Sequence, residues 1–433
     1  MLCLSTRSKS AAIPLHQAII EGIAPDGGLY LPEHLPQIDA AALLASETYQ
    51  QAALQVMAPF FAGDPLADKL PGMIECAFNF PTPLKSLNTK RDYLLELFHG
   101  PTSAFKDVGA RFLAECFAAV PVKNKTRTIL VATSGDTGGA VAAAFHQQDD
   151  VRVVVLFPDG RVSARQAHQL SCFGDNIQSY RVQGSFDDCQ RLVKSAFADK
   201  ALSEQYALTS ANSINLGRLL PQMSYYAWSA VQYAKQNSGM QKLNFIIPSG
   251  NLGNAFAAVL MKAAGAPIGD IVLATNANTV LADFFETGQY SPRDSVSTLA
   301  NAMDVGAPSN LERLRYLYAD NEIHQAILKV ESVNDDEIRR AIPVALDKYD
   351  EIICPHTACG MVALERLRDA GDTRDWCLVA TAHPAKFETV VEPLIQQSIG
   401  IPGPLQKLLD RPAHAEFLAP ELGALISVLG KSV

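Results

Sequence analysis

The chain has 433 residues, more than one hydrophobic core usually holds, and its length therefore predicts two or three domains. Hydrophobic residues make up 48% and charged residues 19%, a composition typical of a globular protein with substantial cores. The formal net charge of −9 argues against a surface for nucleic acid or for an anionic membrane, although a local pocket can still be positive.

Cysteine usage and the lack of long apolar runs indicate where the protein is expected to reside. The eight cysteines are scattered and none forms a C-x-x-C pair, a pattern that predicts a reduced, cytoplasmic protein. The start of the chain does not resemble a signal peptide, and no window approaches about 18 uninterrupted apolar residues. We therefore expect no membrane span and no membrane partner.

Residues 1–90 predict a small accessory domain, in which AIIEGIAPDGGLYLP combines a helix end, a turn and a short strand. The segment ASETYQQAALQVMAPFFAG then has the apolar spacing of an amphipathic helix. From residue 91 apolar runs alternate with helical stretches, at TRTILVAT, VRVVVLFP, QSYRVQG, LNFIIPSG, DIVLAT and DWCLVAT. This alternation predicts a parallel α/β sheet covered on both faces, with ligands bound beyond the carboxyl ends of its strands. The tail from residue 396 is predicted to be helical.

A lone lysine opens one of the predicted helices. Lys106 follows the small-residue turn GPTSA in FHGPTSAFKDVGARF and leads into a helix-like run. A helix start already carries partial positive charge, so a second cation gains no stability there. An amine that acts as a nucleophile, in contrast, can use a site that lowers its pKa. Lys106 is therefore a candidate catalytic amine, and Lys386, which also follows a strand-end loop, is its rival.

Three polar loops follow predicted strands. In VATSGDTGGAVAAAF and FIIPSGNLGNAFAAVL, a glycine-containing turn opens a helix whose free N–H groups suit a carboxylate or a phosphate. The second loop lacks the P-loop lysine and the dinucleotide fingerprint, which favours a compact phosphate monoester over a nucleotide. In CLVATAHPAKFE, Thr381 offers a hydroxyl where the strand ends. Each loop taken alone is equally explained as a capped helix start.

The segment TSANSINLGRLLPQMSYY adds a cation to this set. It gathers Asn212, Ser213, Asn215 and Arg218 at a helix start. Asn and Ser can cap the helix, and Arg218 could complete a phosphate pocket through charge-assisted hydrogen bonds. A helix-start lysine with a phosphate cradle in an α/β fold predicts pyridoxal phosphate as the cofactor. The remaining two anion sites suit a substrate that carries both a carboxylate and a phosphate, such as a phosphorylated amino acid.

In this order, the motifs resemble those of the threonine synthase family, in the tryptophan synthase β-subunit class of pyridoxal phosphate enzymes. The resemblance covers nearly the whole chain, in STRSK…AIIEGIAPDGGLYLP, FHGPTSAFKD, ATSGDTGGA, NSINLGR, PSGNLGN and TAHPAKF. It implies an α/β fold of two parallel-sheet domains with an N-terminal accessory domain. We place the accessory domain in residues 1–90, the large cofactor domain in 91–125 and 225–433, and the small α/β domain in 126–224.

The resemblance also implies roles for individual residues, with Lys106 forming the Schiff base with the cofactor and Thr381 meeting its pyridine nitrogen. The cofactor phosphate would be bound by Ser249, Gly250, Asn251, Leu252, Gly253 and Asn254. The substrate carboxylate would lie by Ser134, Gly135, Asp136 and Thr137, and the substrate phosphate by Asn212, Ser213 and Arg218. Asp136 departs from the wider class, where an asparagine often faces the cofactor's 3′-oxygen. An ionised Asp136 would repel that oxygen, so contact needs a shared proton or an outward side chain.

The implied activity converts O-phospho-L-homoserine and water to L-threonine and phosphate, the last step of threonine biosynthesis, by γ-elimination and β-addition of water. The rivals are a phospholyase, which would release ammonia and a 2-oxo acid, a dehydratase, which needs no second phosphate pocket, and a non-catalytic or nucleotide-binding protein. CPHTACG has the wrong spacing for common zinc sites, so we expect no metal and a structural or hydrogen-bonding use of His356 and His383. The chain is expected to act as a monomer or homodimer.

Overall fold

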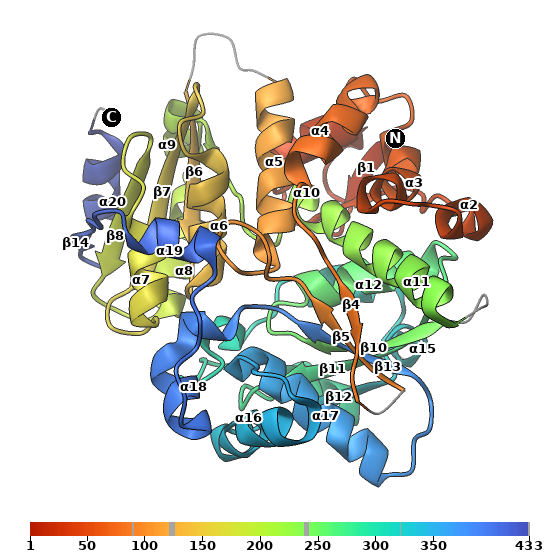
Figure 1. Cartoon of the computed structure of the whole chain (residues 1–433). Helices are drawn as coiled ribbons and strands as arrows, with labels where there is room; N and C mark the ends of the chain where they lie inside the picture. Colours follow the sequence, from red (N-terminus) through yellow and green to blue (C-terminus); the bar gives the residue numbers. More distant parts are fainter. Residues whose placement is uncertain (89–90, 121–125, 238–241, 321, 432–433) are drawn as a thin grey trace.

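The computed structural model describes residues 1–88, 91–120, 126–237, 242–320 and 322–431. Three β-sheets organise the chain, and their helices pack around them (Figure 1). In the part of the chain that the structure describes, no helix is both long enough and apolar enough to cross a membrane. The domain boundaries predicted at residues 90 and 125 fall in segments outside the described residues, and the boundary near 225 falls inside a continuous helix. All three boundaries stay predictions.

The N-terminal region is built on a three-stranded antiparallel sheet of order β2-β1-β3. Its elements are β1 (Leu2–Ser5), β2 (Ile13–Pro14), α1 (Leu15–Glu21), β3 (Tyr30–Pro32), α2 (Ala40–Leu44), α3 (Tyr49–Phe61), η1 (Ala67–Lys69) and α4 (Leu70–Ala77). The predicted amphipathic helix and short strand are confirmed as α3 and β3. Helix α3 buries Val56 and Phe60, and the hydroxyls of Tyr49 and Ser224 lie 2.8 Å apart, which joins this region to a helix from much later in the chain.

A five-stranded parallel sheet of order β14-β8-β7-β6-β9 forms the second unit. Its elements are β6 (Arg127–Ala132), α6 (Asp136–Phe145), β7 (Val151–Pro158), α7 (Ala164–Ser171), β8 (Ile177–Val182), α8 (Phe186–Ala198), α9 (Lys200–Tyr206), β9 (Leu208–Thr209), β14 (Glu416–Leu418) and α20 (Leu422–Leu429). Every residue of β7 is buried, as expected for a central strand covered on both faces.

The C-terminal tail was predicted to be helical and to belong to the large domain, and the structure differs on both points. It contains strand β14, which pairs in parallel with β8, and helix α20, which packs on α8 beside the small sheet (Figure 1). A strand of only three residues has too few positions to show a period-two pattern. Its partner strand also lies far away in the sequence, so local patterning could not reveal the pairing.

The third and largest sheet has the order β12-β11-β10-β13-β5-β4, with all strands parallel except the edge strand β4. Its strands are β4 (Leu84–Ser86), β5 (Asp92–Glu96), β10 (Leu243–Pro248), β11 (Ile268–Thr275), β12 (Lys329–Ser332) and β13 (Trp376–Ala380). The six strands predicted from apolar runs are confirmed as β6, β7, β8, β10, β11 and β13. Strand β5, DYLLE, was missed because its two acidic ends interrupt the apolar run.

Helices and short 3₁₀ turns cover the large sheet and connect it to the other two. They are α5 (Lys106–Ala119), α10 (Leu216–Leu219), η2 (Leu220–Gln222), α11 (Met223–Asn237), α12 (Gly253–Ala263), α13 (Val280–Thr287), η3 (Asn301–Met303), α14 (Leu311–Leu317), α15 (Ile323–Ala326), α16 (Asp335–Tyr349), α17 (Pro355–Asp369), η4 (Pro384–Phe387), α18 (Glu388–Ile395) and α19 (Gly403–Leu409). One continuous cluster of buried apolar side chains runs from the N-terminal region into both larger sheets, so the three units share a core.

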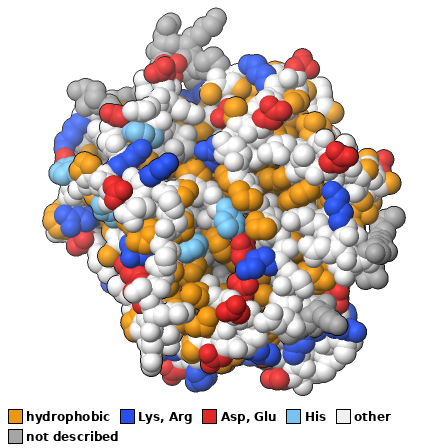
Figure 2. All heavy atoms as spheres, viewed as in Figure 1, with side chains coloured by type: hydrophobic (Ala, Val, Ile, Leu, Met, Phe, Trp, Pro, Cys, Tyr) orange, Lys and Arg blue, Asp and Glu red, His pale blue; other side chains and the backbone are white. Residues whose placement is uncertain are grey.

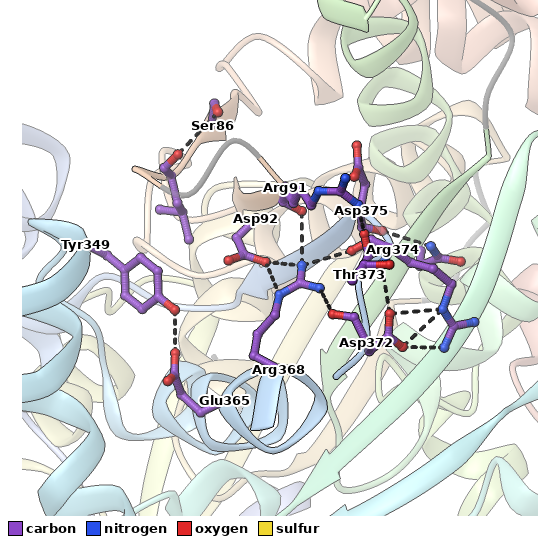
Figure 3. A network of polar contacts seen from close by, with 12 residues as sticks. Ser86, Arg91, Asp92, Tyr349, Glu365, Arg368, Asp372, Thr373, Arg374 and Asp375 are labelled. Carbon is purple, nitrogen blue, oxygen red and sulfur yellow. Dashed lines mark hydrogen bonds and ion pairs between the residues drawn. The ribbon is translucent and has the colours of Figure 1, made fainter. Parts of the chain in front are cut away.

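An ion-pair network fixes the amino ends of two neighbouring strands (Figure 3). Asp92, the buried first residue of β5, accepts a hydrogen bond from Nε of Arg368 at 3.0 Å. Arg368 lies near the end of α17 and also donates to the carbonyl of Asp372 at 2.5 Å, and Asp372 pairs with Arg374 just before β13. The network lies at the edge of the sheet opposite the carboxyl ends of its parallel strands. We therefore assign it to the fold and look for ligands at the other edge.

Charges of both signs are interspersed on the face drawn in Figure 2, with histidine side chains near its middle. At the carboxyl end of β5, Lys85 bridges Glu96 at 3.2 Å and Glu351 at 2.6 Å, and His99 lies 2.7 Å from Glu96. Among its described residues, this face therefore shows no single cluster of positive charge. Any cation that meets an anionic ligand is better sought inside the molecule.

Two adjacent glycines of α6 test the packing of that helix. A Cβ on Gly138 would lie 2.5 Å from side-chain carbons of both Leu170 and Thr133, whereas one on Gly139 would meet only Gln169, at 3.7 Å. We expect Gly138→Ala to lower the free energy of unfolding by about 1–3 kcal/mol through overpacking. Gly139→Ala should be neutral or stabilising, because alanine favours a helix over glycine by about 1 kcal/mol. Urea denaturation measures both, and equal effects would contradict the close contact of α6 with α7.

Candidate active site

The turn that presents Lys106 is tied to the end of β13. The N–H of Phe105 donates to the carbonyl of Thr381 at 2.9 Å, and the N–H of His383 donates to the carbonyl of Ser103 at 3.0 Å. These bonds bring the turn alongside the strand end as an isolated antiparallel bridge. Lys106, the first residue of α5, therefore lies next to the segment that carries Thr381.

A buried carboxylate shapes the turn from inside. Asp107 accepts hydrogen bonds from the N–H of Thr102 at 2.9 Å and from its hydroxyl at 2.6 Å. A Cβ on Gly100 would lie 2.5 Å from an oxygen of Asp107, and Ser103 has a left-handed φ of 54°. Burial raises the pKa of Asp107, although the bonds from Thr102 oppose the rise. The run of small residues before Lys106 is explained by this tight turn.

Lys386 is a buried cation held by two segments of the site. Its ammonium lies 2.8 Å from Oδ1 of Asp136 and donates to the carbonyl of Thr102 at 2.8 Å. The amide of Gln166 donates to the same oxygen of Asp136 at 2.9 Å. The ion pair thus connects η4, the start of α6 and the lysine turn. We infer that Lys386 balances charge, since its amine is bound by two acceptors and fully buried, whereas Lys106 is mostly buried but keeps some exposure.

Burial and the neighbouring charges together set the protonation of Lys106. Burial lowers the pKa of Lys106 from 10.5 to about 8, with Asp136 opposing the shift and Arg218 and Lys386 adding to it. Burial alone would raise the pKa of Asp136, but the ammonium groups of Lys386 and Lys106 outweigh it and hold that pKa below its usual range. Asp136 is therefore ionised and paired with Lys386, and its contact with the cofactor's 3′-oxygen stays a prediction. Lys106 keeps a sizeable neutral fraction near neutral pH, as a nucleophile requires.

The two histidines near these charges act as neutral hydrogen-bond acceptors. Burial lowers the pKa of both His356 and His383 to about 4. Nε2 of His356 accepts the N–H of Ala302 at 3.0 Å, and Nδ1 of His383 accepts the N–H of Ala385 at 3.1 Å. In the same CPHTACG segment, Cys354 caps the start of α17. These contacts account for the segment by local hydrogen bonding.

The predicted substrate-carboxylate loop turns between β6 and α6. The hydroxyl oxygen of Thr133 accepts the N–H groups of Gly135 at 3.0 Å and Gly138 at 2.9 Å, which fixes the turn. Gly135 has a φ of 137°, and a Cβ there would lie 2.5 Å from the amide of Gln166. Ser134 and Thr137 in this turn are partly exposed.

The two predicted phosphate segments contact each other. Nδ2 of Asn251 donates to the hydroxyl of Ser213 at 2.7 Å, and a Cβ on Gly253 would lie 3.0 Å from the Cβ of Ser213. Leu252 has a φ of 61°, a strained conformation for a residue with a side chain, and such strain clusters at ligand-binding loops. The segment predicted for the substrate phosphate therefore packs directly against the loop predicted for the cofactor phosphate.

Three buried polar atoms in these segments have no hydrogen-bond partner among the described residues: Nε of Arg218, Oδ1 of Asn212 and Nδ2 of Asn254. Oδ1 of Asn254 lies 2.5 and 2.7 Å from the hydroxyls of Tyr225 and Tyr226, which fixes the amide with Nδ2 left over. Burial lowers the pKa of Arg218 to about 10, so its guanidinium stays charged at neutral pH. Unpaired buried donors are costly unless a ligand satisfies them, and these two donors suit an anion.

Sequence reasoning missed the residues that support this site from the side. Gln166, besides donating to Asp136, accepts a hydrogen bond from Nδ2 of Asn301 at 3.0 Å, which links α7 to η3. The spacing of Ser163 and Gln166 forms a capping box, and a capping box predicts a helix start without indicating a distant partner. The sequence places Tyr225 and Tyr226 in a helical run but does not show that their hydroxyls bond to Asn254.

Comparison with known proteins gives matches over the whole chain. The family model "Threonine synthase N terminus" matches residues 3–78, "Pyridoxal-phosphate dependent enzyme" matches 77–384, and "Threonine synthase, C-terminal" matches 357–428. The threonine synthase of Buchnera aphidicola from Acyrthosiphon pisum is 37% identical, with 99% of each chain covered. The chain belongs to the threonine synthase family. The family predicted from the sequence motifs is therefore confirmed.

Solved structures of threonine synthases share the fold of the whole chain. The enzyme of Escherichia coli superposes with a TM-score of 0.91 at 34% identity, covering 99% of each chain. That of Brucella melitensis, described as bound to PLP, gives 0.89 at 32% identity and covers 99% of this chain and 98% of its own. Maize serine racemase, at 15% identity and 0.53, shares the fold alone. The predicted fold class, two parallel-sheet α/β domains with an N-terminal domain, is confirmed.

Membership of the pyridoxal-phosphate-dependent enzymes confirms the predicted cofactor. The residues present fit that group. The site of this threonine synthase family member has a mostly buried lysine with a lowered pKa, and an unpaired amide donor on Asn254 in the first turn of α12. A strand-end threonine, Thr381, lies beside the lysine turn. Which atom of the cofactor each residue contacts stays a prediction.

Replacing Lys386 tests how the charges control Lys106. Since Lys386 lowers the pKa of Lys106 and Asp136 raises it, Lys386→Met should move that pKa upward from about 8. Only the free amine attacks an aldehyde, so the apoprotein should capture pyridoxal phosphate more slowly at neutral pH. The half-maximal pH of capture should also rise. Stopped-flow absorbance measured from neutral to alkaline pH follows both quantities.

Two further variants make this test selective. Lys348→Met removes an exposed lysine that pairs with Glu365, and it should leave the capture profile unchanged. Lys386→Met leaves a buried carboxylate unpaired, which costs about 3–5 kcal/mol, and the double variant Lys386→Met with Asp136→Asn should recover much of that stability. A folded Lys386→Met protein with an unshifted profile would contradict the electrostatic account.

Proposed function

We propose that the chain converts O-phospho-L-homoserine and water into L-threonine and phosphate. The observation that carries this proposal is that the two segments predicted to bind phosphate meet near one lysine of lowered pKa. Residues 249–254 and 212–218 are in contact through Asn251 and Ser213, and the charge of Arg218 acts on Lys106. A phosphorylated cofactor and a phosphorylated substrate together need two such segments, whereas a dehydratase needs only one.

Three parts of the chain would hold the cofactor. Residues 249–254 would bind its phosphate at the start of α12, where the helix start and the unpaired Nδ2 of Asn254 favour an anion. Thr381 would place a hydroxyl at its pyridine nitrogen, and Lys106 would bind its aldehyde carbon. When bound, pyridoxal phosphate supplies an electron sink that makes the α-proton of an amino acid removable.

The substrate would lie between the small and large sheets. Residues 134–137 hold its carboxylate, and Asn212, Ser213 and Arg218 hold its phosphate. The buried Nε donor of Arg218 has no partner among the described residues, and a phosphate oxygen would satisfy it. Charge-assisted bonds of this kind stabilise the phosphate most as it departs and gains charge.

Lys106 would move the protons of the reaction. Because its pKa is lowered to about 8, it can accept the proton of the substrate's α-carbon near neutral pH and later return it. Removal of a β-proton accompanies cleavage of the bond between the γ-carbon and the phosphate oxygen. Protonation at the γ-carbon and addition of water at the β-carbon complete threonine. The ion pair of Asp136 with Lys386 keeps the carboxylate beside the site from capturing these protons.

Product analysis tests the proposed function. The purified protein is incubated with pyridoxal phosphate and O-phospho-L-homoserine, and phosphate, threonine and 2-oxobutyrate are assayed together. We expect threonine in equal amount to phosphate. Phosphate accompanied by 2-oxobutyrate would instead identify a phospholyase with the same substrate pocket. Absence of phosphate release would contradict the assignment of residues 212–218 to a substrate phosphate.

A further inference from the structure

Arg313, on α14, is a fully buried guanidinium with no carboxylate partner among the described residues. Its Nε and Nη2 donate to the carbonyl of Tyr30 at 3.1 and 3.0 Å, and Nη2 also donates to the carbonyl of Ile214 at 2.6 Å. Its Nη1 donates to Oδ1 of Asn310 at 2.6 Å. A buried charge without a counter-ion lowers the free energy of unfolding, so we expect this charge to serve a function.

The acceptors of Arg313 lead directly to both phosphate segments. Ile214 is itself part of residues 212–218. Asn310 accepts a hydrogen bond from Arg313 and donates one to the cofactor-phosphate loop. Nδ2 of Asn310 donates to the carbonyl of Asn251 at 2.9 Å and lies 3.4 Å from the carbonyl of Ser213. One fully buried amide therefore bonds to Arg313 on one side and to both segments on the other. Tyr30 at the same time fixes the guanidinium to the N-terminal sheet.

No carboxylate among the described residues is bonded to Arg313, and this leaves a positive charge that suits the two anions of the proposed function. Burial lowers the pKa of Arg313 to about 9, with Glu312 opposing the shift, so the group stays protonated at neutral pH. Its hydrogen bonds all go to neutral acceptors, which leave the positive charge in place. In a low-dielectric interior such a charge acts over a longer distance than in water.

We propose that Arg313 is a positioning residue that holds the cofactor-phosphate loop and the substrate-phosphate segment in register and favours anions in both. The inference rests on the proposed function, because it requires that both segments bind phosphate. Arg313 acts through Asn310 and the carbonyl of Ile214, and it is not assigned any contact with substrate or cofactor. Its planar fork spreads donors over three nitrogens that reach three separated acceptors, a geometry that the compact ammonium of a lysine does not reproduce.

The test uses the holoprotein and measures three phosphate-dependent quantities: KM for O-phospho-L-homoserine, the inhibition constant of inorganic phosphate, and the dissociation constant of pyridoxal phosphate from absorbance titration of the apoprotein. We expect Arg313→Lys and Asn310→Ala each to raise all three by about tenfold or more, the effect of losing a charge-assisted hydrogen bond. The kcat of the folded, cofactor-loaded fraction should change much less. Asn310→Ala leaves Arg313 in place, so the test survives if Arg313→Lys fails to fold.

Arg315→Lys is the matched control, because Arg315 lies one half-turn further along α14, is exposed and pairs with Asp320. It should leave all three quantities unchanged. If Arg313→Lys and Asn310→Ala reduced only the amount of folded protein, with the three constants unaltered, the residue would be merely structural and the inference would be overturned. Failure of the proposed function looks different, because the wild-type protein itself would then release no phosphate from O-phospho-L-homoserine.

Discussion

The buried ammonium of Lys386 is the constraint on which the site depends, because it allows a carboxylate and a nucleophilic lysine to lie together. Asp136 opens α6, where its charge favours the helix start, but an unpaired carboxylate would hold Lys106 in its protonated form. The contact of 2.8 Å with Lys386 neutralises Asp136. The carbonyl of Thr102, also bound by Lys386, fixes the same ammonium to the turn that presents Lys106. One cation therefore balances the charge beside the reactive amine and is bonded to the turn that presents it, while burial is the main cause of the lowered pKa of Lys106.

The surrounding fold brings together segments that are far apart in the chain. The lysine turn, the loop after β6 and the loop after β10 all follow the carboxyl ends of parallel strands, where a ligand can approach the edge of a sheet. Residues 212–218 and α14 then close the phosphate side, and the contacts of Asn310 and Arg313 join them to the N-terminal sheet. The N-terminal region is thus a structural support of the site as well as a separate sheet.

Much of the site could be predicted from the sequence because its parts are locally encoded. In each of three segments a strand or turn is followed by a helix within about ten residues. These segments are the small-residue turn before Lys106 and the glycine loops at residues 134–139 and 249–254. The supports were not predictable in this way. The sequence shows Lys386 as a second strand-end lysine, Gln166 as part of a helix start and Arg313 as a charged residue of a helix. It does not show what these residues bond to, because their partners lie in other segments. Strand β14 was missed for the same reason.

The measurement that tests the central claim most directly is to identify the lysine that holds the cofactor. The holoprotein is reduced with borohydride, digested with a protease, and the modified peptide is sequenced by mass spectrometry. The account predicts a pyridoxyl group on Lys106 and an unmodified Lys386. A pyridoxyl group on Lys386 would contradict the account, because the charge that balances Asp136 would then be the reactive amine itself.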